Sequence, residues 1–440
     1  MRDGRAWLES LLGLFAQVRR GEGVRALLLT ANIFVLLVAY YLLKVVREPL
    51  VLTGGTLGMS GATLKAAAAT GQAILLSGVV PAYAWLAARA DRMRLINVVT
   101  GIFAACLIGF YCLGGAGVSI GFPFFIWLGI FNVLVVAQFW SFASDVYTPA
   151  QGKRLFAIVG FGQTSGAVAG SALAAWLIPH LGAYNLMLVA AALLVVALAL
   201  GNRVHQMGRR REPAVRPAVE SRRGGFKLVL ANRYLLLVAF LTLVYNTVNS
   251  NGEFILGATV VDHARAVATS VKQQQEIIGG FYGGYFGAIN ILTAALQLFA
   301  VSRVLEYGGV RAALLVMPII SLGGYALVAT MPIFGIIRVA KILENGIDYS
   351  LQNTTRQALF LPTTRAEKYQ AKAAIDTFFV RIGDVLSLAL VAVVTGALGL
   401  GVKAMAVLNV ALVVVWIALA VVIGRRYDRA LAAPPARARI

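Results

Sequence analysis

Ionisable side chains lie in parts of this chain that are otherwise apolar enough to cross a membrane. The segment YYLLKVVREPLVLT, residues 40–53, places Lys44, Arg47 and Glu48 near the end of the first long apolar run. A charged side chain at the centre of a bilayer costs about 2.5–3.5 kcal/mol even on the lenient insertion scale. A chain that accepts this cost usually handles a charged ligand or an ion, so the segment indicates a transporter.

The fourth and seventh apolar runs each carry a polar stripe. In the fourth run, Asn132, Gln138 and Asp145 follow one another at about two helical turns. Asp145 lies near the predicted end of that run, where it could equally be a solvated carboxylate. The seventh run, VYNTVNSNGEFILGATV, puts five polar side chains on one face: Tyr245, Asn246, Asn249, Ser250 and Glu253. Such a density of polar groups favours a helix that lines a cavity.

The tenth and eleventh runs are the most charged. Arg338, Lys341 and Glu344 step by three residues, and they could pair among themselves, Lys341 with Glu344 for example, and serve only structure. Further charges follow in the same two runs: Asp348, Arg356, Lys368, Lys372, Asp376, Arg381 and Asp384. Cations in a dehydrated cavity bind phosphate or carboxylate, while carboxylates there can hold those cations in an empty site or carry protons.

Aromatic side chains accompany these charges. Tyr40, Tyr41, Trp140 and Tyr245 could stack against a ring. A small anion with several charges and an aromatic part fits such a cavity, which points to nucleotides as the substrate. Organic phosphates and acidic metabolites also fit.

The composition places these charges in an integral membrane protein. The 440 residues are 60% hydrophobic and 13% charged, and the mean hydropathy is +0.81. Soluble domains are about 45–50% apolar and about 25% charged. The net charge of +21 does not indicate nucleic-acid binding, because most basic residues lie in short segments between apolar runs, as membrane topology requires.

Other classes of site lack their motifs in this sequence. The two cysteines, Cys106 and Cys112, share one apolar run, and the three histidines are scattered, so we expect no disulfide, metal site or cofactor. No GxxxxGK[ST] motif occurs, which argues against an ATP-driven pump. No nucleophile–base pair is evident, so we do not expect an enzyme.

Twelve apolar runs of helical length predict an all-α, polytopic membrane protein. We expect helices near 26–52, 64–88, 95–114, 122–146, 154–178, 184–200, 234–261, 277–301, 311–330, 332–358, 371–397 and 403–423. They form two six-helix bundles, 26–200 and 234–423, as in the major facilitator architecture. The remaining segments are an amphipathic N-terminal segment 1–25, a basic linker 201–233 and a basic tail 424–440. The Lys and Arg balance puts both termini and the linker in the cytoplasm.

Specific stretches are similar to the ATP/ADP translocase (nucleotide transporter) family of plastids and obligate intracellular bacteria. The matching stretches are LKVVREPLVLT at 43–53, FWSFASDVYTPAQGKRLFAIVGFG at 139–162, YNTVNSNGE at 245–253, and YSLQNTTRQALFLP with QAKAAID within 349–376. The resemblance implies a major-facilitator-like fold, exchange of ATP for ADP, and a bacterial inner (cytoplasmic) membrane as the location.

The resemblance also implies site residues. The family's four important charges would fall on Arg47, Asp145, Glu253 and Lys372, with the sign of the charge kept at each. The chain departs from the family where the family tends to read KYSLFDPTKE and this chain reads DYSLQNTTRQ, residues 348–357. A lysine becomes Asp348, while Arg356 keeps one cation. Replacing a lysine with an aspartate weakens the expectation of a triphosphate and indicates a divergent member.

These observations predict a monomeric secondary transporter that works by alternating access. Arg47 and Lys372 would hold phosphate oxygens, while Asp145 and Glu253 would balance them; Lys44, Arg356, Tyr245, Asn249 and Asp376 complete the candidate substrate site. A rise of about 1.5 Å per residue puts Arg47 about 33 Å along a helix that starts at Arg25, near the outer mouth. A proton-coupled transporter or exporter of another organic anion, and a non-transporting scaffold or sensor, stay open as alternatives.

Overall fold

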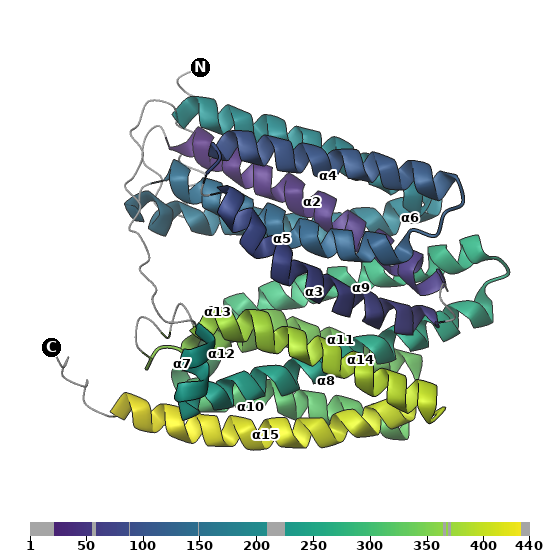
Figure 1. The fold of residues 1–440 in the computed structure, drawn as a ribbon, viewed down its shortest axis with the longest axis vertical. Coiled ribbons are helices and arrows are strands. Elements are labelled where there is room, and N and C mark those ends of the chain that lie inside the picture. The colour runs from purple at the N-terminus through teal and green to yellow at the C-terminus, as the bar shows by residue number, and fades with distance from the viewer. Residues whose placement is uncertain are drawn as a thin grey trace. The chain divides into compact units, whose positions relative to one another are not determined.

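The structure, a computed structural model, describes residues 22–54, 59–87, 89–147, 149–208, 225–363, 367 and 371–432. The described part is helical and contains no strand (Figure 1). In the first half of the chain the helices are α2 (Gly23–Thr53), α3 (Gly61–Ala87), α4 (Arg92–Gly115), α5 (Gly121–Val146) and α6 (Pro149–Gly208). Most of the predicted segment 1–25 lies outside the described residues.

The second half contains a short helix, four long ones and two segments that alternate between α and π geometry. They are α7 (Gly225–Ala231), α8 (Arg233–Val267), α9 (Val271–Phe299), α10 (Val301–Thr330), α11 (Phe334–Ile347), η1 (Asp348–Gln352), α12 (Asn353–Ala358), α13 (Lys372–Ala374), η3 (Ile375–Phe379), α14 (Val380–Val391), η4 (Ala392–Ala397) and α15 (Val402–Ala432).

The predicted fold class is confirmed: the chain is an all-α, multi-pass membrane protein. In the described part, ten helices are long and apolar enough to span a membrane. One of them, α6, covers two predicted helices and turns between them at Gly182, where φ is 76°. The predicted helix 332–358 is not among the ten; it is divided into α11, η1 and α12. Part of the predicted linker is helical, since α6 continues to Gly208 and α7 begins at Gly225.

The chain divides into two compact units, each described by itself below. The N-terminal unit contains α2, α4, α5, α6, the part of α3 from Leu75 onward and the part of α9 up to Gly287. The C-terminal unit contains the part of α3 up to Ile74, α7, α8, the part of α9 from Ala288 onward and α10 to α15. Both α3 and α9 therefore contribute to both units. The predicted bundle boundaries at 26–200 and 234–423 stay a prediction.

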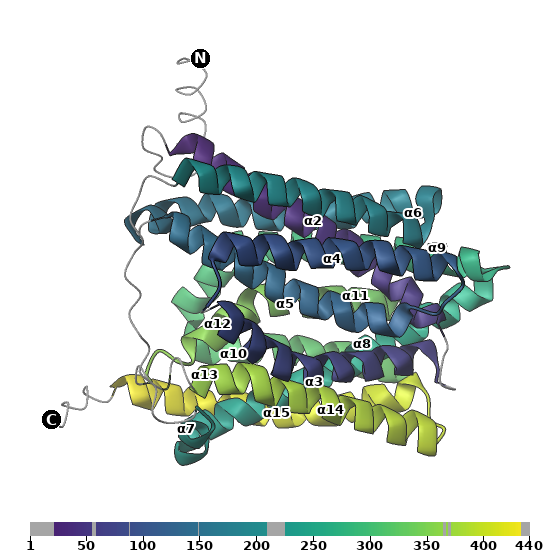
Figure 2. The same cartoon turned by 45° about the horizontal axis from the view of Figure 1, so that its top comes forward.

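Close helix packing organises the N-terminal unit, where α6 lies along α2 and α4 (Figures 1 and 2). A Cβ atom added at Gly162, Gly166 or Gly170 of α6 would lie only 2.5–2.7 Å from a backbone carbonyl oxygen of α2. The glycines therefore allow the two helix backbones to approach each other, as small residues do between membrane helices.

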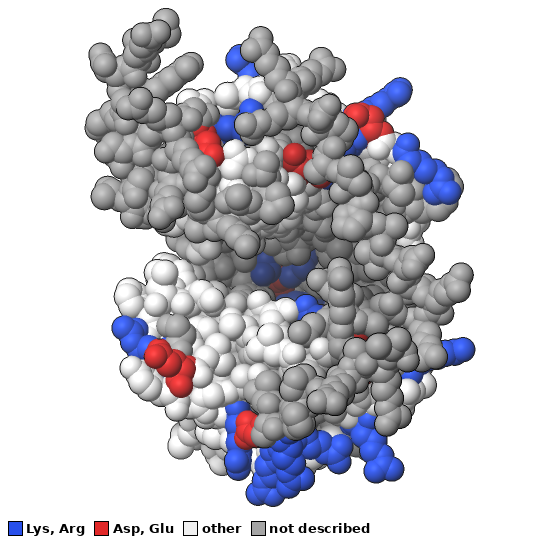
Figure 3. All heavy atoms as spheres, turned by 90° about the vertical axis from the view of Figure 1, so that its left-hand side faces the viewer, with Lys and Arg blue, Asp and Glu red and all other residues white. Residues whose placement is uncertain are grey.

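In the C-terminal unit, α15 packs along α10. The C-terminal turns of α15 carry exposed Arg425, Arg426 and Arg429. Figure 3 shows the side of the molecule on which α15 ends, where many Lys and Arg side chains gather. Such a basic end fits the predicted cytoplasmic face.

Candidate functional site

A network of buried ionic groups occupies the middle of the C-terminal unit. We call it the Lys341 cluster; its members are Lys65, Asn249, Glu253, Tyr325, Lys341, Glu344 and Asn345, from α3, α8, α10 and α11. The Lys341 Nζ lies 3.0 Å from Oε2 of Glu344 and 3.6 Å from Oε1 of Glu253. On its other side, Glu253 meets the Nζ of Lys65 at 3.3 Å.

Hydrogen bonds complete the Lys341 cluster. The Tyr325 hydroxyl donates to the Glu344 carboxylate at 2.9 Å, and the Asn345 amide donates to Glu253 at 3.1 Å. Lys341 also donates to Oδ1 of Asn249 at 3.3 Å. The side chains of Lys341 and Glu344 are only 3% and 4% exposed. Buried charges are tolerated when they are paired and hydrogen-bonded, so two cations and two carboxylates here form a neutral, fixed unit.

A second ionic group of the same unit is more exposed to solvent. We call it the Arg356 cluster; its members are Tyr245, Asp348, Arg356, Lys372 and Asp376. The Asp376 carboxylate is shared by two cations, with Oδ1 3.4 Å from Arg356 and Oδ2 3.8 Å from Lys372. The side chains of Arg356, Lys372 and Asp376 are 20%, 30% and 34% exposed, so all three are only partly buried.

An aromatic ring supports the Arg356 guanidinium. The guanidinium carbon lies 5.4 Å from the centre of the Tyr245 ring, within the range of a cation–π contact. The Tyr245 hydroxyl donates to Asp348 at 2.6 Å, and both residues are buried. Asp348 is the first residue of η1, a π-helical turn, and such turns often occur at functional sites. The buried Tyr245–Asp348 pair therefore fixes one face against which Arg356 rests.

Another acid of the C-terminal unit, Asp384, connects α14 to α8. Its carboxylate accepts hydrogen bonds from Asn246 at 2.7 Å, Ser250 at 2.9 Å and Arg381 at 3.3 Å. All five groups of the predicted polar face of α8 thus contact a carboxylate or a lysine of another element: Tyr245, Asn246, Asn249, Ser250 and Glu253. That face is engaged in interhelical ionic contacts within the C-terminal unit.

The N-terminal unit holds Lys44 and Arg47 near the end of α2. Arg47 donates to Oε1 of Glu48 from Nε at 3.1 Å, and its guanidinium carbon lies 4.1 Å from the centre of the Phe125 ring. The Lys44 Nζ lies 4.2 Å from the centre of the Phe286 ring. Both cations are therefore stabilised by aromatic faces in an otherwise apolar region.

Arg47 and Asp145 lie far apart within that unit. Arg47 contacts Phe125 near the start of α5, whereas Asp145 lies near its end, 20 residues later, which is about 30 Å along a helix. The Asp145 side chain is 51% exposed and pairs with Arg92. The structure thus places Asp145 as a solvated carboxylate at a helix end, and places Arg47 near the opposite end, as its position in the sequence predicts.

Glu253 and Lys372 also belong to separate clusters. Lys341, the partner of Glu253, and Arg356, which shares Asp376 with Lys372, are 15 residues apart, roughly 20 Å along the α11–α12 segment. The structure therefore does not bring the candidate charges of one unit together: Glu253 and Asn249 lie in the Lys341 cluster, and Tyr245, Arg356, Lys372 and Asp376 lie in the Arg356 cluster.

Sequence reasoning missed two members of the Lys341 cluster: Lys65 and Tyr325. One signal for Lys65 was available, since it is a lysine inside an apolar run, as Lys44 is. The Lys341–Glu344 pair that the spacing allowed is confirmed. Among the described residues, no three His, Cys, Asp or Glu side chains gather closely enough to hold a metal ion.

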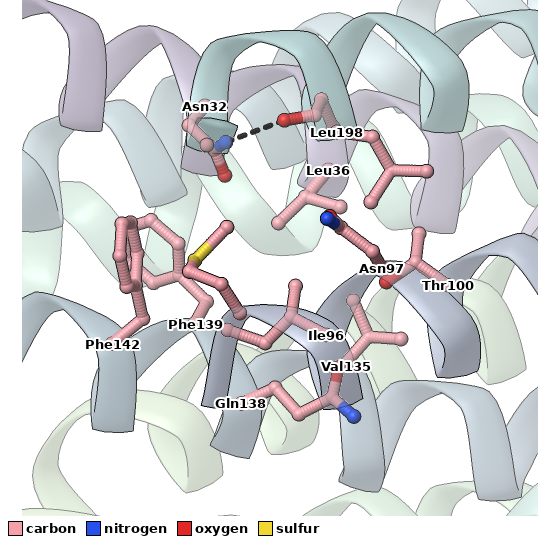
Figure 4. A pocket seen from close by; sticks show the side chains of 13 residues that line it. Asn32, Leu36, Ile96, Asn97, Thr100, Val135, Gln138, Phe139, Phe142 and Leu198 are labelled. Atoms are coloured by element: carbon pink, nitrogen blue, oxygen red, sulfur yellow. Dashed lines mark hydrogen bonds between the residues drawn. The ribbon is translucent and has the colours of Figure 1, made fainter. Parts of the chain in front are cut away.

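A small cavity lies inside the N-terminal unit, between α2, α4, α5 and α6 (Figure 4). Its volume is about 30 Å³, and its polar lining residues are Asn32, Asn97, Thr100 and Gln138. Asn32 donates to the Ala197 carbonyl oxygen at 2.7 Å. No charged side chain lines the cavity, and its volume suits about two water molecules. It is therefore not a site for a phosphorylated substrate.

Comparison with known proteins gives a family match for part of the chain and a fold for nearly all of it. Residues 309–427 match the family model described as TLC ATP/ADP transporter. This range contains Tyr325, Lys341, Glu344 and every member of the Arg356 cluster except Tyr245. No curated protein sequence matches the chain significantly.

Solved transporter structures resemble the chain over nearly its whole length at low identity. A bacterial homolog of the human lysosomal transporter Spinster, inward-facing and unoccupied, is 13% identical, with a TM-score of 0.63 over 95% of this chain and 100% of that chain. An auto-inhibited POT family peptide transporter has 13% identity and a TM-score of 0.64, over 94% and 97% of the two chains. The nucleoside transporter NupG has 13% identity and a TM-score of 0.58, over 92% and 100%.

These likenesses establish the fold, and the family model adds a specific sequence match. The family resemblance predicted from the sequence is confirmed. The chain is thus a major-facilitator-like membrane protein whose residues 309–427 match the TLC ATP/ADP transporter family.

Proposed function

We propose that the protein is a secondary transporter that carries a nucleotide, or a related phosphorylated anion, by alternating access. The match of residues 309–427 to an ATP/ADP transporter model carries this proposal. The transporter fold and the likeness to a nucleoside transporter support it. We place the transporter in a bacterial inner membrane as a monomer, with both termini in the cytoplasm.

The Arg356 cluster is the best phosphate-binding candidate among the described ionic groups. Two of its cations, Arg356 and Lys372, are exposed enough to exchange partners, whereas Lys341 is almost fully buried. A guanidinium binds two phosphate oxygens at once, and a nearby ammonium adds a point charge. Arg47 would contact the substrate at the end of the N-terminal unit that lies opposite to Asp145. Glu253 would have a structural role, as a partner of Lys65 and Lys341 in the Lys341 cluster.

Exchange of labelled nucleotide in proteoliposomes tests the proposal. Vesicles loaded with unlabelled ATP or ADP should take up labelled ATP or ADP when they contain the wild-type protein. Arg356→Gln and Lys372→Gln should each reduce this exchange at least tenfold. Lys403→Gln, which neutralises an exposed lysine at the start of α15, is the matched control and should leave exchange unchanged. No nucleotide exchange by the folded wild-type protein would refute the proposal.

A second candidate, proton-coupled transport of another organic anion, has one observation in its favour. The ionic groups described above in the C-terminal unit hold equal numbers of the two signs: five cations (Lys65, Lys341, Arg356, Lys372, Arg381) and five carboxylates (Glu253, Glu344, Asp348, Asp376, Asp384), of which all but Asp348 form ion pairs. Such a balance offers no surplus positive charge for a highly charged anion, and carboxylates in membrane helices can carry protons. Uptake of an organic anion that ignores nucleotides and collapses with a protonophore would favour this candidate.

A further inference from the structure

Asp376 holds its two cations more loosely than the buried Glu344 carboxylate holds Lys341. Charge-assisted hydrogen bonds are normally about 2.7–2.9 Å long. Asp376 lies 3.4 Å from Arg356 and 3.8 Å from Lys372, and all three side chains are partly exposed. Glu344, by contrast, lies 3.0 Å from Lys341 in a site that is almost closed to solvent. Partly exposed ion pairs contribute only about 0–1 kcal/mol, so the contacts of Asp376 are easily broken.

The position of Asp376 is the one that an incoming anion needs. Its two carboxylate oxygens point to different cations, Oδ1 to Arg356 and Oδ2 to Lys372. A phosphate group carries at least two acceptor oxygens and could bridge the same two cations. A phosphate and the carboxylate would repel each other between these cations, so only one of them can hold the position.

The other contacts of Arg356 and Tyr245 do not involve the Asp376 carboxylate. Arg356 keeps its contact with the Tyr245 ring, and Tyr245 keeps its hydrogen bond to buried Asp348. Lys372 is the first residue of α13 and is anchored by its own helix. The displacement uncovers two positive charges, which match the roughly two negative charges of a terminal phosphate.

We propose that Asp376 occupies the anion position between Arg356 and Lys372 in the empty protein, and that the phosphate of the substrate displaces it. Asp376 is then an internal competitor of the substrate and sets the affinity of the site. The substrate head group is a phosphate or pyrophosphate with about two negative charges, because a singly charged carboxylate gains nothing over Asp376 itself. The inference rests on the proposed function for its substrate but concerns anion binding alone.

Binding of inorganic pyrophosphate to the purified protein in nanodiscs tests this inference. Asp376→Asn keeps the size of the side chain and removes the competing charge, so pyrophosphate should bind about three- to tenfold more tightly by titration calorimetry. Asp376→Glu keeps the charge and should bind within about twofold of the wild type. Glu306→Gln removes an exposed carboxylate on α10 and serves as a control for overall charge. Combining Asp376→Asn with Lys372→Gln should abolish the gain.

Several outcomes overturn the inference. Unchanged or weaker pyrophosphate binding in folded Asp376→Asn would show that Asp376 positions the cations and does not compete. Asp376→Ser is the second variant should the first one fail to fold, and loss of folding in both would make Asp376 a structural partner of the two cations. The nucleotide exchange experiment is separate, so the two proposals can fail independently. Exchange by the wild type without a gain in pyrophosphate affinity in Asp376→Asn refutes only this inference. A gain in affinity in Asp376→Asn without exchange by the wild type refutes only the proposed function.

Discussion

Lys341 should contribute more to stability than Lys65, although both are buried lysines that pair with Glu253. Replacing Lys341 with Met leaves the buried Glu344 without its cation and removes one of the two cations of Glu253. Replacing Lys65 with Met leaves Glu253 paired with Lys341 and hydrogen-bonded to Asn345. The comparison between the two variants therefore tests whether the Lys341 cluster is one connected unit.

The distances within the ion pairs give the expected difference in stability between the Lys341→Met and Lys65→Met variants. With an effective dielectric constant of about 20, the attraction of Lys341 to carboxylates at 3.0 and 3.6 Å sums to about 10 kcal/mol before desolvation, against about 5 kcal/mol for Lys65 at 3.3 Å. Desolvation cancels much of both values, and removing one partner of a buried pair typically costs about 3–5 kcal/mol. We therefore expect Lys341→Met to fall in that range and Lys65→Met to cost about half as much.

Thermal unfolding of the purified variants, followed by intrinsic fluorescence at one scan rate, measures the ranking. The fall in the midpoint should be about twice as large for Lys341→Met as for Lys65→Met. Arg338→Met, an exposed cation on the same helix as Lys341, is the control and should change little. Lys341→Met combined with Glu344→Leu should be more stable than Lys341→Met alone, because it no longer buries an unpaired carboxylate. Equal effects of the two lysine variants, or strictly additive effects in the double variant, would refute the reasoning.

Three further outcomes are expected. Gly166→Ala should destabilise the N-terminal unit by about 1–3 kcal/mol, because its Cβ would lie 2.5 Å from the Phe34 carbonyl oxygen; Gly160→Ala meets no atom within 4 Å and should be neutral in the same thermal assay. Tyr245→Phe removes the hydroxyl that donates to buried Asp348 and should lower stability by about 1.5–3 kcal/mol; an unchanged midpoint would contradict the value given to this bond. Asp376→Asn should retain nucleotide exchange in proteoliposomes but lose net uptake into empty vesicles, because the empty carrier would have to reorient with one uncompensated positive charge; equal loss of both activities would contradict this expectation.

The helices could be predicted from the sequence because a bilayer leaves the backbone few options. Every spanning segment must satisfy its own hydrogen bonds, so each long apolar run becomes a helix. All twelve predicted ranges are indeed largely helical in the described part of the chain. The π-helical turns η1, η3 and η4 could not be predicted, since apolar patterning does not distinguish them from α-helical turns. The run 332–358 differs from the ten candidate spans because η1 interrupts it after the 14 residues of α11, and because it carries Arg338, Lys341, Glu344 and Asp348.

The site could be predicted only where its contacts are local. Lys341 with Glu344 and Lys372 with Asp376 are three and four residues apart, so helical geometry alone brings each pair together. Lys65 and Glu253 are 188 residues apart, and no pattern within either run indicates their contact. The resemblance to a family identified Arg47, Asp145, Glu253 and Lys372 as candidate site residues. It could not show that Asp145 pairs with Arg92 at a helix end.

Burial, more than the sign of the charge, separates the ionic groups of the C-terminal unit. Both clusters balance their charges, but Lys341 and Glu344 are almost fully buried, whereas Arg356, Lys372 and Asp376 are all partly exposed and their contacts are replaceable. A substrate that entered the Lys341 cluster would have to break the contact between Lys341 and Glu344, two almost fully buried ions of which the carboxylate already accepts a hydrogen bond from Tyr325, at a cost of several kcal/mol for each ion. A substrate at the Arg356 cluster has only to replace one carboxylate with another anion. We therefore expect Arg356 and Lys372 to bind the phosphate, and the Lys341 cluster to hold α3, α8, α10 and α11 together.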